Sequence, residues 1–325
     1  MHTHEVSYFC FMLRYQDIRN NERRLVGLTS LKSAEFDYLL SHFSPLCEGY
    51  FRYHTYAGKL RKIPKFGPQS DEKFPESSDK LLFLLIYLKN NALQEFHAAY
   101  YDISQGQVSN LVRVLMPLLD QALGKMGFRP CRDSQSLKNQ LRDHPDRVFS
   151  QDATQRPIGR KVDYEAQKED FSGKSKDHTD KNHLLCDDAS QILYLSPTYE
   201  GSIHDKALLD EENIQWLPHI SLRQDTGYQG YAPENVTIIQ PTKKPRGTEL
   251  TDAQKQQNKA ISKERVIIEN AIAGLKRLRI LKDRIRHKCY DLKDQIMCIG
   301  CALHNLRLTS PVRSYNPRTL AWALQ

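Results

Sequence analysis

Three acidic residues in the second half of the chain have the types and positions of a metal-binding catalytic site. Asp152 and Asp225 each stand at the end of a β-type run, and Glu269 lies inside a long helical pattern. The spacings are 225 − 152 = 73 and 269 − 225 = 44 positions. Carboxylate oxygens suit Mg²⁺ or Mn²⁺, and two such ions can activate an attacking oxygen and stabilise a leaving one. The three residues therefore predict a two-metal site for phosphodiester chemistry.

The helix that carries Glu269 also carries two cations on nearly the same face. Around the helix axis, Lys276 lies about 20° and Glu269 about 40° from Arg265. The apolar residues of this helix fall on another side, so the charged face can border a site while the rest packs on a sheet. Arg265 and Lys276 are then candidates for holding phosphates. An ordinary salt-bridged helix, with Arg265 and Glu269 at i,i+4, is the plainer interpretation of this face taken alone.

The elements that must position these residues follow an α/β order. A helix is expected over 205–211 and a long one over 251–281. The chain from residue 148 onward shows short β-type runs between turns, which are Val148–Gln151, Asn182–Cys186, Gln191–Leu195, Ser221–Gln224 and Val236–Gln240. This order predicts a five-stranded mixed sheet with flanking helices.

A helix-turn-helix pattern stands earlier, in QEFHAAYYDISQGQVSNLVRVL. Ala98 is the small residue of the first helix, and Ile103, Ser104 and Val108 follow at offsets of 5, 6 and 10 as turn residue, N-cap and anchor. Asp102 occupies a position where Gly is usual. The residues on or near the exposed face can bond base edges and phosphates, and they are Gln105, Gln107, Ser109, Asn110 and Arg113. A helical hairpin in a bundle is the alternative without DNA.

Composition narrows the class of protein without naming a function. The 325 residues suggest about two domains, and Lys+Arg exceed Asp+Glu by 47 to 39, for a net charge of +8. A basic surplus favours a polyanionic partner, and no apolar run is long enough for a membrane span. Seven scattered Cys favour a reducing compartment over a disulfide scaffold. We expect a bacterial cytoplasmic protein associated with the nucleoid, or a nuclear one if the host is eukaryotic.

Five sequence blocks together resemble the DDE transposases of bacterial insertion sequences, in the branch related to the Harbinger transposases. One is the Arg265-x3-Glu269-x6-Lys276 signature in the long helix. The others stand before it in the family's order, and they are DATQRPI, FSGKSKDHT, GSIHD and DTGYQG. The resemblance covers about 148–308, and the helix-turn-helix region is similar to that branch's DNA-binding domain. The chain departs from the pattern at Ser262, where a Tyr often stands three positions before the signature Arg, which puts one substrate contact in doubt.

The resemblance implies an RNase H-like catalytic domain with Asp152, Asp225 and Glu269 as metal-binding catalytic residues and two Mg²⁺ or Mn²⁺ ions per site. It also implies cleavage at transposon ends and joining of the 3′-hydroxyls to target DNA. The partners would be double-stranded DNA, as terminal inverted repeats and target, and a second copy in a homodimer or larger assembly. The alternative is a catalytically silent, transposase-derived protein that binds specific DNA sequences.

Three shorter motifs contain further candidate residues, and two of these motifs allow two interpretations. Lys174 and Lys176 in the SGKSK block are further phosphate candidates. His204 and Asp205 in GSIHD are candidate accessory residues near the metal, although Asp205 as a helix cap is the favoured interpretation. Cys298-x2-Cys301 with a nearby His invites a zinc site, but its flanks have the apolar spacing of a buried helix, which is favoured.

The predicted domain organisation has six parts. The two functional ones are a helix-turn-helix DNA-binding domain at 81–128 and the catalytic domain at 147–313. The rest comprises an N-terminal helical region at 1–58, a polar loop or linker at 59–80, a connection at 129–146 and a C-terminal tail at 314–325. The predicted fold is thus an α/β RNase H-like domain preceded by an all-α one.

Overall fold

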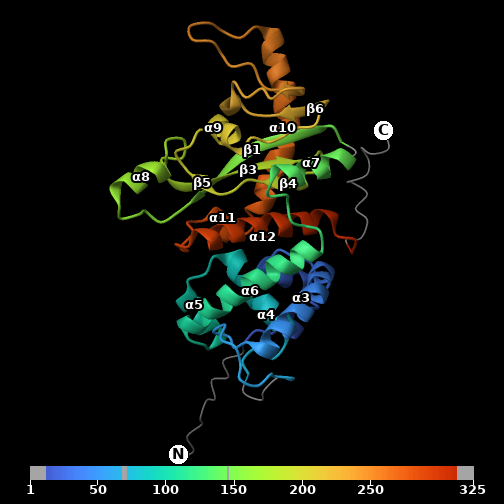
Figure 1. Ribbon diagram of the computed structural model, residues 1–325, viewed down its shortest axis with the longest axis vertical. Coiled ribbons are helices and arrows are strands. Elements are labelled where there is room, and N and C mark those ends of the chain that lie inside the picture. Colours follow the sequence, from blue (N-terminus) through green and yellow to red (C-terminus); the bar gives the residue numbers. More distant parts are fainter. Residues whose placement is uncertain (1–11, 68–71, 145, 313–325) are drawn as a thin grey trace, which may run out of the picture. The chain divides into compact units, whose positions relative to one another are not determined.

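The computed structural model describes residues 12–67, 72–144 and 146–312. The predicted tail at 314–325 lies outside these residues. The chain divides into two compact units, Met1–Ala122 and Leu123–Gln325, and each has its own arrangement of elements (Figure 1). No helix within the described ranges combines the length and apolar character needed to cross a membrane. The boundaries of the six predicted parts stay predictions.

The regular elements of the first unit, where it is described, are all helices, as predicted. Its apolar helix α4 is buried along most of its length and packs against the helices that precede it. Tyr15 of the first helix stacks on Phe36 with ring centroids 4.1 Å apart. The helices are α1 (Tyr15–Ile18), α2 (Glu22–Thr29), α3 (Ser33–Tyr53), α4 (Ser77–Asn90), α5 (Gln94–Tyr101) and α6 (Gln105–Lys125).

The helix-turn-helix consists of α5 and α6. Asp102 ends α5 in the left-handed conformation, at φ 49° and ψ 51°, which is the backbone that Gly usually supplies. Ser104 Oγ accepts from Gln107 N at 3.2 Å, and Gln107 Oε1 accepts from Ser104 N at 2.8 Å, which is a reciprocal capping box. Ala98 and Val108 are buried. The predicted motif is therefore present with its turn, cap and anchor.

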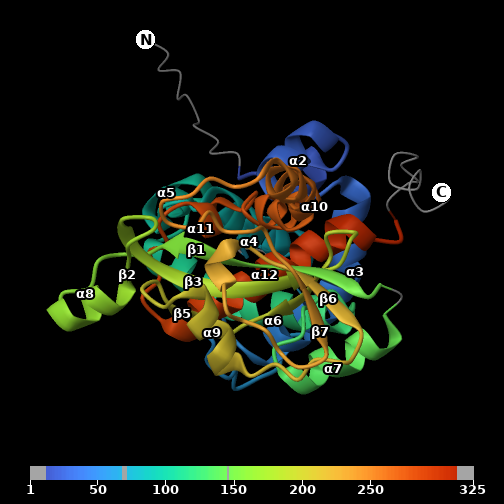
Figure 2. The same ribbon diagram turned by 90° about the horizontal axis from the view of Figure 1, so that it is seen from above.

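The second unit is built on one mixed sheet (Figure 2). β1 pairs antiparallel with β3 and parallel with β6, and β6 pairs parallel with β7. The five predicted strands are all present, and two dipeptide strands, β2 and β5, enlarge the sheet to seven. The strands are β1 (Val148–Pro157), β2 (Phe171–Ser172), β3 (Asp177–Cys186), β4 (Ile192–Leu195), β5 (Tyr199–Glu200), β6 (Ile220–Arg223) and β7 (Val236–Ile239).

Helices cover both faces of this sheet. On one face, α7 (Ser134–Asp143) and α9 (Asp205–Glu212) form an apolar core with β1, β3, β4 and β6, which includes Leu137, Phe149 and Leu222. On the other, α10 (Asp252–Leu275) packs on β1 and β3, and α12 (Tyr290–Thr309) packs on β4. Two short helices, α8 (Tyr164–Asp170) and α11 (Arg279–Lys282), complete the unit. The predicted mixed sheet with flanking helices is confirmed.

The long helix expected over 251–281 ends earlier than predicted. α10 stops at Leu275, with Lys276 as its C-cap, and α11 begins at Arg279 after a break. Residues 276–278 contain neither Gly nor Pro, Gly274 lies in the last turn of α10, and tertiary packing meets the chain at the break. Leu275 and Leu281 both press on Gly300 of α12, where an added Cβ would lie 2.8 Å and 2.3 Å from their Cδ1 atoms. A continuous helix could not direct both leucines to this point.

The cysteines of α12 belong to a buried helix, as favoured by their apolar flanks. Cys298 and Cys301 are buried, and His304 Nε2 bonds the carbonyl oxygen of Ser190 at 2.9 Å. These residues pack the helix against its neighbours. They form no metal-ligand group within the described chain.

Candidate active site

Asp152 and Asp225 are brought to the same level by neighbouring parallel strands. β1 and β6 pair with Ser150 opposite Arg223, so the two aspartates each lie two residues further along. Side chains two positions apart on a strand share a face, so Asp152 continues the side of β1 that carries Ser150. The pairing thus brings two residues 73 positions apart to one edge of the sheet.

One guanidinium lies across both aspartates. Arg265 of α10 places Nη2 3.7 Å from Asp152 Oδ2 and Nη1 3.5 Å from Asp225 Oδ1. Its side chain is 12% exposed, against 18% for Asp152 and 36% for Asp225. Arg265 Nε is buried without a hydrogen-bond partner among the described residues. The three side chains therefore form one partly buried charged cluster that solvent reaches from the Asp225 side.

Three residues predicted to bind phosphate interact electrostatically with Asp152, and they are Arg265, Lys174 and Lys276. Burial raises the pKa of Asp152, whereas Arg265 and Lys174 lower it and the charge of Asp225 raises it. Burial also lowers the pKa of Lys276, and Asp152 acts against that effect. A carboxylate kept from water beside a second carboxylate favours a bound cation. The donor set of Asp152 and Asp225 therefore fits a divalent ion with oxygen ligands.

Glu269 lies one helical turn beyond Arg265, with an exposed side chain. Among the contacts of the described residues, none joins Glu269 to either aspartate. The buried stripe of α10 contains Ile261, Ile268, Ala271 and Leu275. Helical periodicity places Arg265 at the border of this stripe and Glu269 about 40° further out. The structure therefore gathers two members of the predicted triad and leaves the third at the rim.

The two accessory candidates differ in their surroundings. The N-cap of α9 is His204, whose exposed side chain makes no capping bond, so the favoured interpretation of Asp205 as the cap is wrong. Asp205 Oδ1 instead lies 3.1 Å from Lys181 Nζ. Its Oδ2 lies against the turn that follows Asp225, because a Cβ on Gly227 would be 2.9 Å from it. Asp205 is thus an ion-paired carboxylate next to the Asp225 turn.

Lys176 lies apart from this group. Its side chain is exposed and its backbone is left-handed, at φ 54°. Among the described residues no ion pair links it to either aspartate. Lys174 is exposed as well, but its charge lowers the pKa of Asp152, an effect that Lys176 does not have.

Sequence reasoning missed the residues that hold the aspartates from behind. Gln151 Nε2 donates to Gln224 Oε1 at 2.7 Å, and both side chains are buried. Each glutamine directly precedes one of the two aspartates of the candidate site. Tyr228, in the turn after Asp225, is buried with a hydroxyl that has no described partner, and burial together with the nearby carboxylates raises its pKa. The DTGYQG block was the signal for Tyr228, and nothing in the sequence marks the glutamine pair.

Arg156, in the DATQRPI block, was also missed by sequence reasoning. It is fully buried, and its guanidinium donates to the carbonyl oxygen of Lys293 in α12 at 2.9 Å and to Asn182 Oδ1 at 2.9 Å. A buried guanidinium with several acceptors is a structural anchor. Arg156 therefore ties the far end of β1 to α12.

The predicted DNA-reading residues of α6 differ in how far their side chains are already hydrogen-bonded within the protein. Gln105, Ser109 and Arg113 are exposed. Gln107 is exposed but engaged in the capping box. Asn110 Oδ1 accepts from Arg113 Nη2 at 3.2 Å. The face is polar, as a DNA-reading helix requires, and each base contact stays a prediction.

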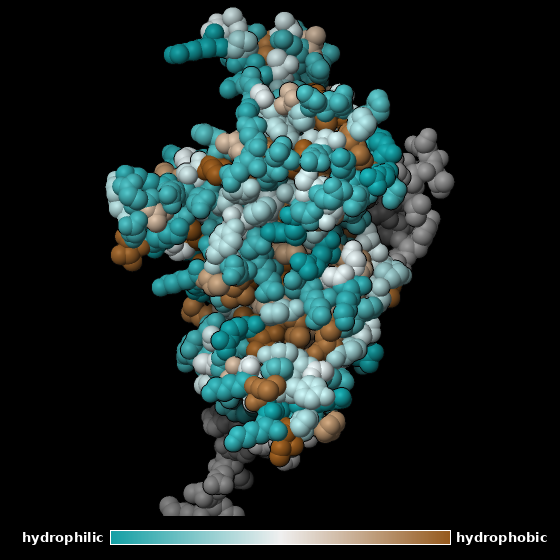
Figure 3. Space-filling view, in the orientation of Figure 1, coloured by the Kyte–Doolittle hydropathy of each residue, from teal (hydrophilic) through white to brown (hydrophobic). Residues whose placement is uncertain are grey.

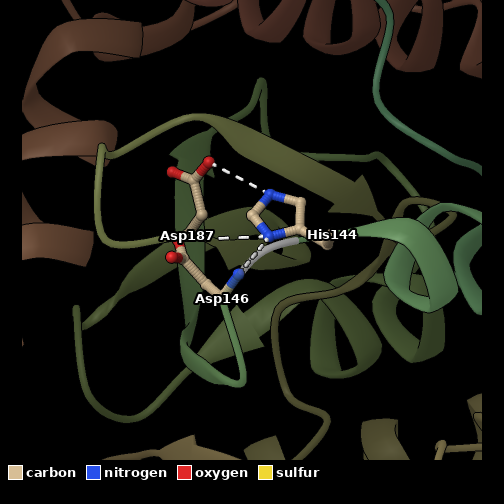
Figure 4. Close-up of side chains that lie close together, drawn as sticks. All are labelled: His144, Asp146 and Asp187. Atoms are coloured by element: carbon tan, nitrogen blue, oxygen red, sulfur yellow. Dashed lines mark hydrogen bonds and ion pairs between the residues drawn. The ribbon is translucent and has the colours of Figure 1, made fainter.

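A separate group of metal-binding types lies at the start of β1 and the end of β3 (Figure 4). His144, Asp146 and Asp187 each bring one ligand atom within 4.8 Å of the others, and among the described residues this is the group that meets that spacing. His144 Nε2 lies 3.5 Å from Asp187 Oδ2, and Asp146 N donates to His144 Nδ1 at 3.2 Å. An imidazole with carboxylates suits Mn²⁺ or Zn²⁺, whereas polar contacts among the three residues alone are the metal-free explanation.

Comparison with known proteins gives a family for both parts of the chain. Residues 151–305 match the family model described as DDE superfamily endonuclease, and residues 76–125 match helix-turn-helix of DDE superfamily endonuclease. A protein of Microchaete diplosiphon described as "Probable transposase for insertion sequence element IS702" is 32% identical over 149 residues. The match covers 45% of this chain and 53% of that protein, so the chain spans about half the length of its curated relative. No solved structure matches.

The first match begins at the residue before Asp152 and takes in Asp225, Arg265 and Glu269, and the second takes in the α5–α6 motif. The link to the Harbinger branch stays a prediction. A helix-turn-helix precedes a mixed α/β unit, and both are matched in the same order, so residues 76–125 and 151–305 are assigned to the DDE superfamily of endonucleases.

Proposed function

We propose that the protein is a metal-dependent DDE transposase that cuts DNA at transposon ends and joins the 3′-hydroxyls to target DNA. The observation that carries this proposal is the convergence of Asp152 and Asp225 from neighbouring parallel strands onto Arg265. The family supports the reaction class, and the strand transfer step is the finer part of the proposal.

Each residue has a distinct task in the proposed reaction. Asp152 and Asp225 would hold Mg²⁺ or Mn²⁺, in two ions per site, and Glu269 would complete the ligand set from the rim. The bound metal supplies activation of the attacking oxygen and stabilisation of the leaving one. Arg265 neutralises the aspartate pair in the metal-free protein and would turn to the scissile or flanking phosphate, with Lys174 and Lys276 as further phosphate contacts.

The proposal includes partners. DNA would bind as terminal inverted repeats through Gln105, Gln107, Ser109, Asn110 and Arg113 of α6, and as target at the catalytic site. A homodimer or larger assembly would hold two transposon ends together, in a bacterial cytoplasm. The experiment on assembly is sedimentation of the full chain with and without a duplex that carries one end.

Cleavage tests the proposal directly. We expect wild-type protein to nick supercoiled plasmid, and to cut a fragment that spans the DNA flanking its own coding sequence, in Mg²⁺ or Mn²⁺. Asp152→Asn, Asp225→Asn and Glu269→Gln should each abolish both. Asp187→Asn is the matched control, because it removes a carboxylate from the group in Figure 4. Equal cleavage by wild type and Asp152→Asn would overturn the proposal.

Metal binding separates the two candidate sites. Calorimetric titration of Mn²⁺ with a short duplex present should show binding that Asp225→Ala removes and Asp187→Ala leaves. The reverse pattern would assign the ion to His144, Asp146 and Asp187 instead. No binding in any of the proteins would contradict a metal-dependent reaction.

A further inference from the structure

The last residues of α3 and the chain that follows them to the 68–71 gap, residues 52–67, combine positive charge with exposed apolar side chains; we call this segment the basic loop. It contains five Lys and Arg and no Asp or Glu. Leu60, Ile63 and Phe66 are 74%, 81% and 80% exposed, and Figure 3 shows apolar side chains surrounded by hydrophilic ones at the lower tip of the N-terminal unit. Large apolar groups this exposed mark an interaction surface.

The basic loop has a defined backbone. Its turn is hairpin-like, with Thr55 N bonded to Lys59 O at 2.8 Å and Arg61 N bonded to Tyr53 O at 2.7 Å. Gly58 provides the left-handed residue of the turn at φ 77°. Arg61 Nε is turned inward and donates to the carbonyl oxygens of Phe51 and His54 at 3.1 Å and 2.9 Å. The basic loop is therefore an ordered turn held by backbone and guanidinium hydrogen bonds.

Two lysines of the basic loop make no ion pair among the described residues and are accessible to a binding partner. Lys59 and Lys62 are exposed, and within the described ranges neither has an ion-pair or hydrogen-bond partner for its side-chain nitrogen. Lys65, by contrast, is paired with Glu72. Because Lys59 and Lys62 alternate with Leu60 and Ile63, charge and apolar surface are presented together.

The basic loop packs beside the recognition helix. Arg113 Nη2 donates to the carbonyl oxygen of Ala57 at 3.1 Å, and a Cβ on Gly58 would lie 3.8 Å from Val114 Cγ2. A cavity of about 430 Å³ is lined by the loop on one side and by Gln107 and Asn110 of α6 on the other. Loop and helix therefore border one continuous surface of the first unit.

The loop contacts one side of the predicted DNA-reading face, at Arg113 and Asn110, and leaves Gln105 and Ser109 exposed on the other side. Around the axis of α6, Ser109 lies about 40° and Arg113 about 80° from Gln105. The positions next to the loop, Asn110 and Val114, lie about 140° and about 180° from Gln105. A helix inserted in the major groove would thus bring the basic loop against the adjoining phosphates and the neighbouring groove.

We propose that the basic loop is a second DNA-binding element, in which Lys59 and Lys62 contact phosphates and Leu60 and Ile63 press into the adjoining minor groove. The inference rests on the proposed DNA-binding function of α6. Positive charge without any acid complements the DNA backbone, and exposed Leu, Ile and Phe beside cations are the side chains that minor-groove proteins insert between base steps. The basic loop itself has no acidic residue, and its cations complement the polyanionic backbone of DNA better than they would a second copy of this chain, which has a net charge of +8.

The charge half of the proposal predicts a change in salt dependence. Full-length protein is titrated onto a 30-base-pair duplex of random sequence at several salt concentrations, with fluorescence anisotropy as readout. Lys59→Gln/Lys62→Gln should lower the slope of log K against log salt by about 1.8, which is about 0.9 for each phosphate that is no longer neutralised. The matched control is Arg23→Gln/Arg24→Gln on α2, which removes the same charge from exposed residues of a helix that packs on α1, α3 and α4. An equal slope change in both variants would overturn the proposal.

The apolar half predicts a different signature. Leu60→Ser/Ile63→Ser should weaken binding several-fold at every salt concentration with the slope unchanged, because apolar contacts release no counterions. Thermal midpoints of the variants should match wild type, since the changed side chains are exposed. Wild-type affinity in this variant, or a loss of self-association with DNA binding retained, would assign the apolar residues to a protein contact and contradict the proposal.

A third variant distinguishes failure of the inference from failure of the proposed function. Gln105→Glu/Ser109→Glu places negative charge on the reading face of α6 and should weaken DNA binding whatever the loop does. If this variant loses affinity while both loop variants bind as wild type does, only the inference falls. If wild type does not bind the duplex, or all variants bind equally, the DNA-binding role of α6 falls with it.

Discussion

Gln151 Nε2 donates to Gln224 Oε1 at 2.7 Å in the interior of the sheet, directly behind the two aspartates. The bond fixes the relative positions of β1 and β6, and thereby of Asp152 and Asp225. Because side chains alternate along a strand, each glutamine faces the α7–α9 core while the next residue faces the site. The pair therefore has a purely positioning role.

Replacing one glutamine should damage both stability and chemistry. Gln224→Leu leaves the Gln151 amide buried without its partner, which costs about 1–3 kcal/mol, and cleavage should fall by about 10²-fold as the aspartates shift. The double variant Gln151→Leu/Gln224→Leu should lose less unfolding free energy than the two single variants lose together. Urea unfolding measures this, with the exposed Gln229→Leu as control. Additive losses would show that the two side chains do not act as a pair.

Substitutions at Arg265 and Glu269 should differ in their effects on stability and on DNA cleavage. Arg265→Gln removes a cation from between two partly buried carboxylates, so we expect a loss of about 1–2 kcal/mol, between the values for exposed and buried ion pairs. Glu269→Gln changes an exposed side chain, so stability should stay within about 0.5 kcal/mol while metal-dependent cleavage disappears. Thermal unfolding beside a nicking assay gives both readouts. Full cleavage by Glu269→Gln would remove Glu269 from the proposed triad.

Strand positions could be predicted because the β-type runs and turns are local in sequence. The same holds for the α5–α6 motif, whose turn, cap and anchor occupy fixed offsets. The pairing partners could not be predicted that way, since the Gln151–Gln224 bond and the Arg156 anchor join residues 73 and 137 positions apart. Nothing local distinguishes a buried glutamine from an exposed one.

At the end of α10 and at Asp205, a local sequence preference led to a wrong prediction. The helical pattern continues through Lys276, and only the packing of Leu275 and Leu281 on Gly300 breaks it. Asp205 has the sequence context of a cap, yet Lys181 from β3 provides a nearer charge. In both cases a tertiary contact overrides a local preference. The group around His144 was missed because its members are distant in sequence, since Asp187 follows β3 whereas His144 ends α7.

The capping box of the helix-turn-helix gives a prediction for the first unit. Ser104→Ala removes the acceptor for Gln107 N and should cost about 1 kcal/mol. Ser109→Ala, in the interior of the same helix, should be neutral or slightly stabilising because Ala has the higher helix propensity. Thermal unfolding of both variants is the measurement. Equal midpoints would mean that Ser104 does not cap α6.

Close packing of α10 on α12 makes Gly274 sensitive to a single methyl group. An added Cβ would lie 2.4 Å from His304 Nδ1, and that ring is buried and bonded to Ser190. Gly274→Ala should therefore destabilise by about 1–3 kcal/mol. Gly49→Ala on α3, where nothing lies within 4 Å, should instead stabilise by up to about 1 kcal/mol. Urea unfolding that showed a gain in both variants would contradict the packing described here.

His304 should make stability depend on pH. Burial lowers its pKa to about 4, against about 6.5 in the unfolded chain. The unfolded state then binds more protons between these values, so stability is complete above about pH 6.5 and is lost as pH falls toward 4. The loss from this group is about 3 kcal/mol. The glutamine in His304→Gln does not titrate in this range. The urea midpoint of this variant should therefore fall less than that of wild type between pH 7 and pH 4.5. An equal fall in both proteins would exclude His304 as a source of the pH dependence.

The parallel pairing of β1 with β6 sets the order in which the site can form during synthesis. A ribosome that has released Asp152 must add 73 more residues before Asp225 exists, and another 40 before Arg265 does. At about 5–20 residues per second, that last interval is roughly 2–8 s. A nascent chain therefore carries both aspartates for seconds before their arginine is added, and no chain that ends before Arg265 can assemble the cluster of Asp152, Asp225 and Arg265.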